Sequence, residues 1–394
     1  MTIKTWQFSA ADTLFFGSGK PMSAGESAWI DSEFPPTGLT LQGAIRSAVL
    51  HHTNADIDAF IKGDSCLPDG GSLKDEIGDA KCLGENFKLT GPFLQRDDSL
   101  LFPAPLDLVS DKERQQLLLL KPASQATVCD LGNIRLPICD ATRYKVLENR
   151  YINNSDMAKL LNGETDDIKL IPLFAVAPDD LNALADKEPK VGVALNNKTR
   201  ISKEGMLFSI APVRLRQGVS LKMRVQGIAP EHLPKQTFLQ KLGGEGKLVS
   251  IDISDTLMKM PEARINEQDG MLRFKLVFTQ PALMPVDGWL PEGFTYSENK
   301  GCWTGPLNAC DVSIISVCIG KPLKLGGWDL GAGCSKAKQF YIPAGSVYFC
   351  EASAIHQDQL LQLHDSKLGE KCEYGFGHVL LGRWEPCIQW TSNA

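Results

Sequence analysis

Hydrophobic and polar residues alternate along several short stretches of this chain, and an alternation with a period of two predicts β-strands. Residues 2–9 follow this pattern near the N-terminus, and three consecutive stretches follow it between residues 191 and 228. Residues 40–52 differ, because Leu41, Ile45 and Val49 recur on one side of a helix. The chain is therefore expected to open with a strand, a long loop and a helix, and to continue mainly as strands.

The same kinds of element recur in the second half of the chain. Strands are predicted at 248–254, 271–280, 311–320 and 346–353, short helices at 235–242 and 356–364, and a last strand within 374–384. This order suggests two βαββ-type units, and short strands with few helices favour an α+β fold of two ferredoxin-like domains. We expect the domains to span residues 1–250 and 251–394.

Two stretches of the first domain lack any clear periodicity. Residues 62–86 are rich in glycine and aspartate, and residues 153–167 are polar and acidic. Such compositions are typical of loops, so both stretches are predicted to be surface loops or insertions. A hairpin between them is expected to turn at Asp97, Asp98 and Ser99.

The charge of the chain limits how it could bind a nucleic acid. The 394 residues include 41 basic and 47 acidic residues, a formal net charge of −6. A nucleic-acid contact would therefore need a local basic patch or backbone groups. Between residues 191 and 224 there are seven basic residues and a single acidic residue, Glu204. This basic stretch could be a solvated strand face. Alternatively, Lys198 and Arg200 at the tip of a projecting hairpin (about 191–212) could clamp a phosphate backbone.

Three glycine-containing segments offer a second kind of contact, because glycine lets backbone N–H groups approach a phosphate closely. The segments are GGEG at 243–246, GGW at 326–328 and YGFGH at 374–378. Each alone is a weak signal, since glycine is also common in turns. Together with the basic hairpin they favour a path for single-stranded RNA. Trp328 could stack on a base, although a core tryptophan is the commoner case.

The sequence lacks the motifs of several enzyme and cofactor classes. It has no phosphate-binding GxxxxGK[ST] loop, no GxSxG nucleophile motif and no HExxH metal motif. The 11 cysteines include no Cys-x-x-Cys pair, so free thiols in a reducing cytoplasm are expected, with neither a metal nor another cofactor. His51 and His52 could be ordinary residues at a helix end or an acid/base for RNA cleavage. No signal peptide or membrane-spanning run is expected.

Several of these segments resemble one known family. The stretches DTLFFGSGKPMSAGE, FPPTGLTLQGAIRSAVL, LGGEGK, IGKPLKLGGWDL, IPAGSVYF and YGFGHVLLGRW, between residues 12 and 384, are similar to the third subunit of the Cmr complex. This complex is the type III-B CRISPR effector of antiviral defence, and the subunit is a RAMP protein of the Cas-five-like group. The combination of PAGSVYF with GGWD is the most specific part of the resemblance.

The resemblance implies two ferredoxin-like domains that hold the repeat-derived 5′ tag of the CRISPR RNA. It also implies a β-hairpin thumb that kinks the RNA, and docking on the large Cas-ten-type subunit and the first backbone subunit. The thumb would be the hairpin around Lys198 and Arg200. By position, the remaining RNA contacts would be Gln42, Gly43, Arg46, Gly243, Gly244, Glu245, Gly246, Lys247, Gly326, Gly327, Trp328, Gly375, Gly377 and His378.

The resemblance leaves three functions to be compared. The first is a non-catalytic scaffold that anchors the CRISPR RNA. The second is a metal-independent RAMP endoribonuclease that matures CRISPR RNA, with His51 or His52 as acid/base and Arg46 or Lys247 stabilising the phosphate. The third is a protein–protein adaptor that makes no RNA contact. The scaffold is the expected function, since it needs amides and cations along one path but no activated nucleophile.

Overall fold

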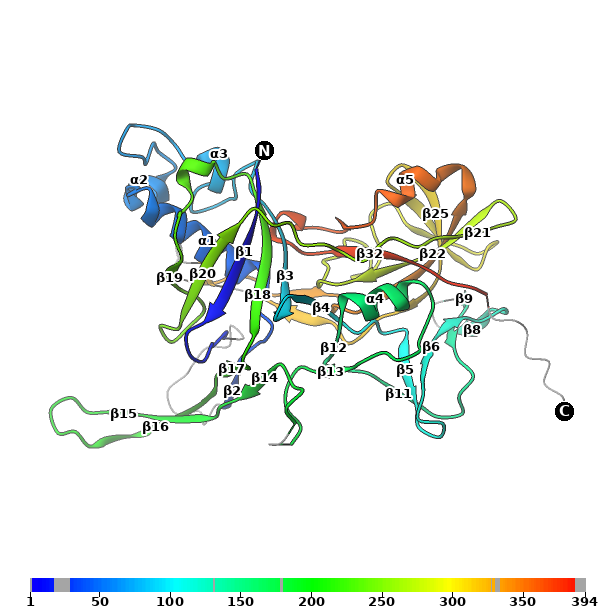
Figure 1. Ribbon diagram of the computed structural model, residues 1–394, viewed down its shortest axis with the longest axis horizontal. Coiled ribbons are helices and arrows are strands. Elements are labelled where there is room, and N and C mark those ends of the chain that lie inside the picture. Colours follow the sequence, from blue (N-terminus) through cyan, green and yellow to red (C-terminus); the bar gives the residue numbers. More distant parts are fainter. Residues whose placement is uncertain are drawn as a thin grey trace. The chain divides into compact units, whose positions relative to one another are not determined.

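The protein has a mixed α+β fold that consists mostly of sheets with few helices (Figure 1). The computed structural model describes residues 2–17, 29–129, 132–177, 180–326, 328–329 and 334–386. The chain forms two compact units, each made of discontinuous segments. Unit 1 comprises Met1–Asp98, Pro172–Met258 and Leu325–Gln339, and unit 2 comprises Ser99–Ile171, Lys259–Lys324 and Phe340–Ala394. The expected boundary at 250 lies near Met258, but the expected domains were continuous and these units are not.

Unit 1 contains an antiparallel sheet with its first strand in the middle. The order is β3 (Lys88–Arg96), β18 (Val219–Gln226), β1 (Ile3–Ala10), β20 (Leu248–Ser254) and β19 (Phe238–Lys241). Helix α1 (Gly38–His52) contacts β3 and β19. Its buried side chains include Leu41, Ile45 and Val49, as the apolar spacing predicted. Trp6 and Phe8 of β1 are fully buried as well.

The helix predicted at 235–242 is wrong, because this segment forms the edge strand β19. Phe238 pairs with Ile251 of β20, and its ring meets Trp6 edge-on with centroids 6.4 Å apart. Along β19, Leu239 and Lys241 are exposed while Phe238 and Gln240 are half-buried, which is the alternation of a strand. The segment between Pro234 and Gly243 is too short for a stable helix of its own, so pairing with β20 decides its structure.

A long hairpin extends from unit 1 (Figure 1). Strands β15 (Lys190–Leu195) and β16 (Ser202–Ala211) pair antiparallel, and we call residues 190–211 the ribbon. At its root, β2 (Trp29–Asp31) pairs in parallel with the end of β16. Next to the root, β14 (Ala185–Lys187) pairs with β17 (Val213–Leu215). The strands predicted within 191–228 are therefore confirmed.

The stretch 62–86 is more than a surface loop. It is preceded by α2 (Ile57–Lys62) and contains α3 (Lys74–Ile77), and the side chains of Leu73 and Ile77 are fully buried. His232, which ends the 3₁₀ helix η1 (Pro230–His232), places its Nδ1 3.0 Å from the Glu76 carboxylate. This contact anchors α3 to a distant part of unit 1, which the local composition could not indicate.

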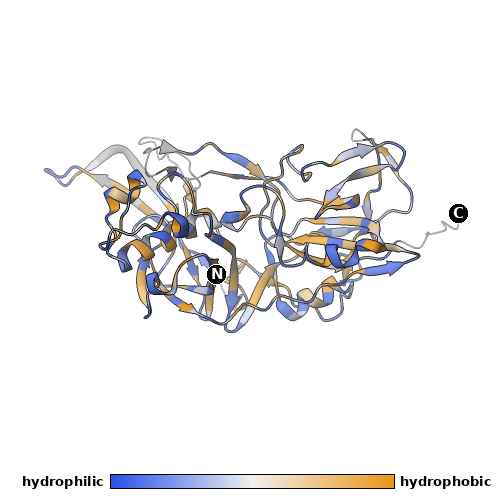
Figure 2. Cartoon of the chain, turned by 90° about the horizontal axis from the view of Figure 1, so that it is seen from above, coloured by the Kyte–Doolittle hydropathy of each residue, from blue (hydrophilic) through white to orange (hydrophobic). Residues whose placement is uncertain are grey.

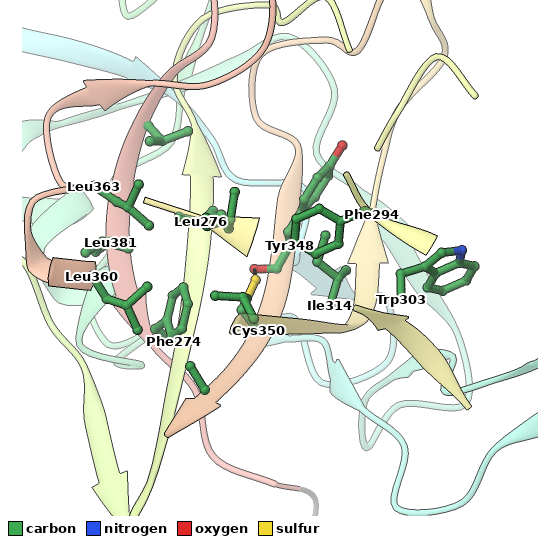
Figure 3. Packing of buried hydrophobic residues seen from close by; sticks show 14 of the residues in the cluster. Phe274, Leu276, Phe294, Trp303, Ile314, Tyr348, Cys350, Leu360, Leu363 and Leu381 are labelled. Atoms are coloured by element: carbon green, nitrogen blue, oxygen red, sulfur yellow. Dashed lines mark hydrogen bonds between the residues drawn. The ribbon is translucent and has the colours of Figure 1, made fainter. Parts of the chain in front are cut away.

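Unit 2 contains a second antiparallel sheet. The order is β23 (Thr295–Ser297), β24 (Cys302–Leu307), β25 (Cys310–Cys318), β30 (Val347–Ser353), β22 (Met271–Phe278), β32 (His378–Arg383) and β31 (Ser366–Lys367), and β21 (Asn266–Gln268) also pairs with β22. Four central strands, β25, β30, β22 and β32, follow the same order along the chain as β3, β18, β1 and β20 of unit 1. Phe274, Leu276 and Leu381 pack on one face with Tyr348 and Leu360, the last from α5 (Gln357–Leu361) (Figure 3). The strands and the helix predicted here are confirmed.

The stretch 153–167, predicted as an insertion, is not a surface loop, because about half of it is the packed helix α4 (Asn154–Leu161). Asn153 caps this helix by accepting a hydrogen bond from the Asp156 N–H at 2.8 Å. Met157, Leu160 and Leu161 recur on one face and are fully buried. The helix contacts β4 (Ser99–Pro103), β12 (Arg150–Asn153) and β32. Its apolar stripe was hidden among polar residues that face solvent.

The remaining elements are short. They are β5 (Leu108–Asp111), β6 (Leu117–Leu119), β7 (Lys121–Pro122), β8 (Thr127–Cys129), β9 (Gly132–Ile134), β10 (Pro137–Ile138), β11 (Tyr144–Val146), β13 (Ile171–Pro172), β26 (Leu323–Leu325), β27 (Trp328–Asp329), β28 (Cys334–Ser335), β29 (Gln339–Tyr341), η2 (Ala354–His356) and η3 (Cys372–Tyr374). None of the helices in the described part of the chain has both the length and the apolar character that a membrane span needs. Hydrophobic residues concentrate along the strands of both sheets (Figure 2).

The role of α4 in the core gives a direct test. We expect Met157→Ala to lower the free energy of unfolding by about 2–5 kcal/mol, because it removes a fully buried side chain from a packed face. Ser155→Ala, at an exposed position of the same helix, should change it by less than about 0.5 kcal/mol. Chemical denaturation of the two variants measures the difference, and equal stabilities would mean that α4 is not part of the core.

Candidate nucleic-acid interface

The tip of the ribbon is an ordered turn that presents two cations to solvent. The Asn196 side chain accepts hydrogen bonds from the backbone N–H groups of Lys198 and Thr199, at 2.9 and 3.3 Å. The Asn196 carbonyl accepts from the Arg200 N–H at 2.8 Å, and Arg200 takes a left-handed backbone conformation with φ of 58°. Asparagine side chains commonly close turns in this way. The turn therefore fixes the backbone, while the Lys198 and Arg200 side chains stay exposed.

The ribbon also exposes apolar side chains. Val191, Val193 and Leu195 are 69%, 45% and 44% exposed. Because alternate residues of a strand point to the same side, Val191 and Val193 share one face of β15, whereas the register shifts between Val193 and Leu195. An apolar face beside a cationic tip suits a partner that has both apolar surface and negative charge, and single-stranded RNA is such a partner.

Two of the remaining basic residues of this stretch, Arg214 and Arg216, contribute less positive charge than the sequence suggests. The Arg214 guanidinium donates to the Glu188 carboxylate, with Nη2–Oε2 at 3.1 Å, and to Asp12 at 2.9 Å. Arg216 binds both oxygens of Asp186, at 2.6 and 2.8 Å. The neutralising acids lie outside the 191–224 window, so a count within that window could not include them.

The loop Gly243–Lys247, which we call the glycine loop, has the geometry of an exposed backbone surface. Gly243 has φ of 79°, and a Cβ added there would lie 2.3 Å from the Phe15 carbonyl oxygen, so only glycine fits. The Gly244 N–H donates to that carbonyl at 2.8 Å. The N–H groups of Gly243, Glu245 and Gly246 donate to no residue in the described part of the chain. Residues 243–246 are exposed, so these amides can reach an anion.

Lys247 lies next to these amides but is partly used within the protein. Its ammonium group donates to the Thr13 hydroxyl at 2.7 Å and lies 3.7 Å from the Asp12 carboxylate. The hydrogen bond from the Thr13 backbone, followed by that from Arg214, lowers the pKa of Asp12 below its ordinary value. Asp12, Thr13 and Glu188 were not predicted as part of the site, because no local motif marks them.

On α1, the three residues singled out by the sequence have different roles. Arg46 donates to the Gln42 side chain at 3.1 Å and to the Asp79 carbonyl, and its guanidinium lies over the Phe60 ring, 5.3 Å from the centroid. Arg46 therefore holds α1 against the 54–86 region. At Gly43 an added Cβ would meet no heavy atom within 4 Å. The helix is open at this position, although glycine weakens a helix interior.

The segment Gly375–His378 does not form an open loop, contrary to expectation. Gly375, Phe376, Gly377 and His378 are all buried. The Gly377 N–H donates to the Pro281 carbonyl at 2.8 Å, and the His378 ring nitrogens lie 2.5 Å from the Thr279 hydroxyl and 2.7 Å from Asp365. These glycines serve close packing, because a Cβ at Gly377 would lie 1.9 Å from the Leu368 carbonyl oxygen. The segment belongs to unit 2, whereas the other described candidates on α1, the glycine loop and the ribbon belong to unit 1.

For the remaining candidate residues the structure describes few contacts. At Gly326 an added Cβ would lie 3.1 Å from the Lys338 side chain. Gly327 lies outside the described residues. Trp328 begins β27, but the structure describes only its backbone. His51 and His52 are exposed at the end of α1. Within the described ranges, no three histidine, cysteine or acidic side chains gather in a way that could hold a metal ion.

A comparison with protein families identifies the class of this chain. Residues 6–384 match the model of a family described as "CRISPR-associated protein (Cas_Cmr3)". The match covers nearly the whole chain, so the protein is a type III CRISPR effector subunit. More specifically, it belongs to the Cas_Cmr3 family, whose members are RAMP-like subunits of the type III-B Cmr complex.

A comparison with solved structures found matches of low sequence identity. One, from a cryo-EM structure of the type III-B Cmr-beta complex bound to cognate target RNA, is 14% identical with a TM-score of 0.47, and the match covers 88% of this chain and 86% of that chain. Another, from a crystal structure of the Csm3–Csm4 subcomplex of the type III-A interference complex, is 12% identical with a TM-score of 0.39, covering 97% and 100%. A search of curated proteins found no matching sequence.

The open surface at Gly43 leads to a stability prediction. We expect Gly43→Ala to raise the free energy of unfolding by about 0.5–1 kcal/mol, since alanine costs less backbone entropy in a helix and no described atom obstructs its Cβ. Gly243→Ala should instead destabilise the protein, because it combines a positive φ with the clash against Phe15. Chemical denaturation measures both. A destabilising Gly43→Ala would show that an internal contact, and not an external partner, requires the glycine.

Proposed function

We propose that this protein is a non-catalytic CRISPR RNA-binding subunit of a type III-B Cmr interference complex. In this proposal it anchors and shapes the 5′ repeat-derived tag and bridges the large Cas-ten-type subunit to the first backbone subunit. The observation that carries the proposal is the combination, within unit 1, of the exposed cationic ribbon tip and the exposed amides of the glycine loop. Membership of the Cas_Cmr3 family supports it.

We further propose that each unit is a variant of the ferredoxin-like fold. In unit 1 the strands β1, β3, β18 and β20 lie in the order β3-β18-β1-β20, and in unit 2 the strands β22, β25, β30 and β32 lie in the order β25-β30-β22-β32. Both orders put the first strand between the third and the fourth, as in a split βαβ arrangement. Unit 1 keeps α1 in the first crossover, and unit 2 keeps α5 in the second.

The two surfaces of unit 1 suit different parts of an RNA strand. Backbone amides at the glycine loop can bind phosphate oxygens without reading bases, which positions the strand. The ribbon adds two cations and an apolar face on which bases can stack. The Gly43 position of α1 would let the strand approach the helix closely. Contacts of this kind hold an RNA without needing a group that transfers protons.

The alternative, a RAMP endoribonuclease, would use His51 or His52 as acid/base. Both side chains are exposed at the end of α1, and neither is hydrogen-bonded to a described residue that would orient its ring. Of the two groups expected to stabilise the phosphate, Arg46 already bonds to Gln42 and Asp79, and Lys247 donates to Thr13. An acid/base needs a fixed position close to the proton that it transfers. This arrangement favours the scaffold over the nuclease.

The first prediction for this function concerns the ribbon tip. We expect the double variant Lys198→Ala, Arg200→Ala to weaken binding of repeat-derived RNA and to reduce the slope of log K against log salt by roughly 1.4, since each phosphate contact with a single strand contributes about 0.7. Fluorescence anisotropy over a series of salt concentrations measures both effects.

The matched control removes two exposed lysines of unit 1 elsewhere, Lys62 and Lys81, which lie in the α2–α3 region. The change in net charge is the same, so a general charge effect would appear equally in both variants. An unchanged slope in the tip variant, or an equal change in the control, would remove the ribbon from the RNA path.

The second prediction separates the scaffold from the nuclease. Purified protein incubated with repeat RNA should leave it intact, with or without chelator, because no oriented acid/base pair faces a common point on α1. Gel analysis of end-labelled RNA measures cleavage. Specific cuts that disappear in His51→Ala or His52→Ala would establish the nuclease and exclude the scaffold.

A further inference from the structure

A short segment near the N-terminus lies between the ribbon root and the glycine loop. We call residues Asp12–Phe15 the strap. Leu14 exchanges two backbone hydrogen bonds with Val213, both 2.7 Å long, and Val213 lies just after the ribbon. The next residue, Phe15, accepts the Gly244 N–H at 2.8 Å. With consecutive residues, the strap therefore joins the strand that follows the ribbon to the glycine loop.

Charged side chains reinforce this link. Arg214 follows Val213 and donates to Glu188, which lies just before the ribbon, and to Asp12 of the strap. Asp12 in turn lies 3.7 Å from the Lys247 ammonium, which also donates to Thr13. The Arg214 hydrogen bond is the first cause of the lowered pKa of Glu188, so both carboxylates that face Arg214 remain ionised. One guanidinium thus joins both ends of the ribbon root to the strap and, through it, to the glycine loop.

We infer that Arg214 is a positioning residue that, through Asp12, fixes the ribbon root at a set spacing from the glycine loop. This inference rests on the proposed RNA-binding function. It explains how the ribbon tip and the glycine loop could bind one RNA strand together. An RNA held at the glycine loop then meets the ribbon tip at a high effective concentration. Without the link, the ribbon would sample more orientations, and each RNA contact would act more independently.

Arg216 provides a matched control two residues along the chain. It forms a bidentate pair with Asp186, much as Arg214 does with Glu188, and both arginines lie next to the ribbon root. The hydrogen bonds of Arg216 do not reach Asp12 or Lys247, within the described part of unit 1. Replacing each arginine by glutamine removes one charge and one bidentate pair, but only Arg214→Gln also removes the side-chain link to Asp12 of the strap.

The test is a double-mutant cycle on the full-length chain with an RNA that carries the tag and part of the guide. The tip substitutions Lys198→Ala and Arg200→Ala are introduced into the wild-type, Arg214→Gln and Arg216→Gln backgrounds. We expect the loss of affinity on removing the tip to be about fivefold smaller in the Arg214→Gln background than in wild type. The Arg216→Gln background should retain the wild-type loss. A merely structural role for Arg214 would lower all affinities equally and leave this ratio unchanged.

Amide hydrogen exchange without RNA gives an independent readout. In Arg214→Gln, exchange should be faster both at residues 190–195 and at the hydrogen-bonded amides of Gly244 and Lys247, whereas Arg216→Gln should leave these two amides unchanged. Asp12→Asn weakens the same Arg214–Asp12 ion pair from the other side. It should give the same increase in exchange as Arg214→Gln, and the double variant should show no further increase.

The inference would be overturned if Arg214→Gln and Arg216→Gln showed the same amide exchange rates and the same loss of affinity on removal of the tip cations. If wild-type protein binds no RNA, the proposed function fails while the exchange experiment still decides whether the link exists.

Discussion

A hairpin of two strands has no core of its own, and this constraint organises much of unit 1. Two-stranded ribbons are marginally stable in water, so their direction depends on what holds the root. Here the root is held by β2 along the end of β16, by the adjoining β14–β17 pair, and by the ion pairs of Arg214 and Arg216. The exposed apolar side chains of β15 and the cations at the tip can be presented to a partner only because the root is fixed.

Charge pairing also limits how this chain, with its net charge of −6, could attract the RNA proposed to bind it. Most charges near the ribbon root are paired, so little long-range attraction remains, and the cations at the tip act at short range. Backbone amides at the glycine loop carry no net charge and bind an anion only when it is close and well placed. A surface of this kind favours a strand already delivered by an assembly over indiscriminate capture of nucleic acid.

Much of the fold could be predicted from local sequence patterns. The strands around residues 191–228 and 271–278 alternate clearly, and the apolar stripe of α1 places Leu41, Ile45 and Val49 in the core. The failures have a common cause. At 235–242 pairing with β20 outweighs helix propensity, and in α4 three buried residues among polar ones become a core stripe only when β4 and β32 are present. Tertiary contacts decided both cases, and no local pattern contains them.

The candidate site shows the same limit more clearly, because the sequence does not distinguish a glycine in an exposed loop from a glycine packed in the core. Gly243 and Gly377 both have positive φ and both would clash with a carbonyl if a Cβ were added. Yet the residues around Gly243 are exposed, whereas Gly377 is buried beside a histidine with both ring nitrogens engaged. The difference lies in what surrounds each loop. An anion-binding backbone can therefore be recognised only once the partners of its N–H groups are known, and a glycine count alone overestimates the number of exposed glycine loops.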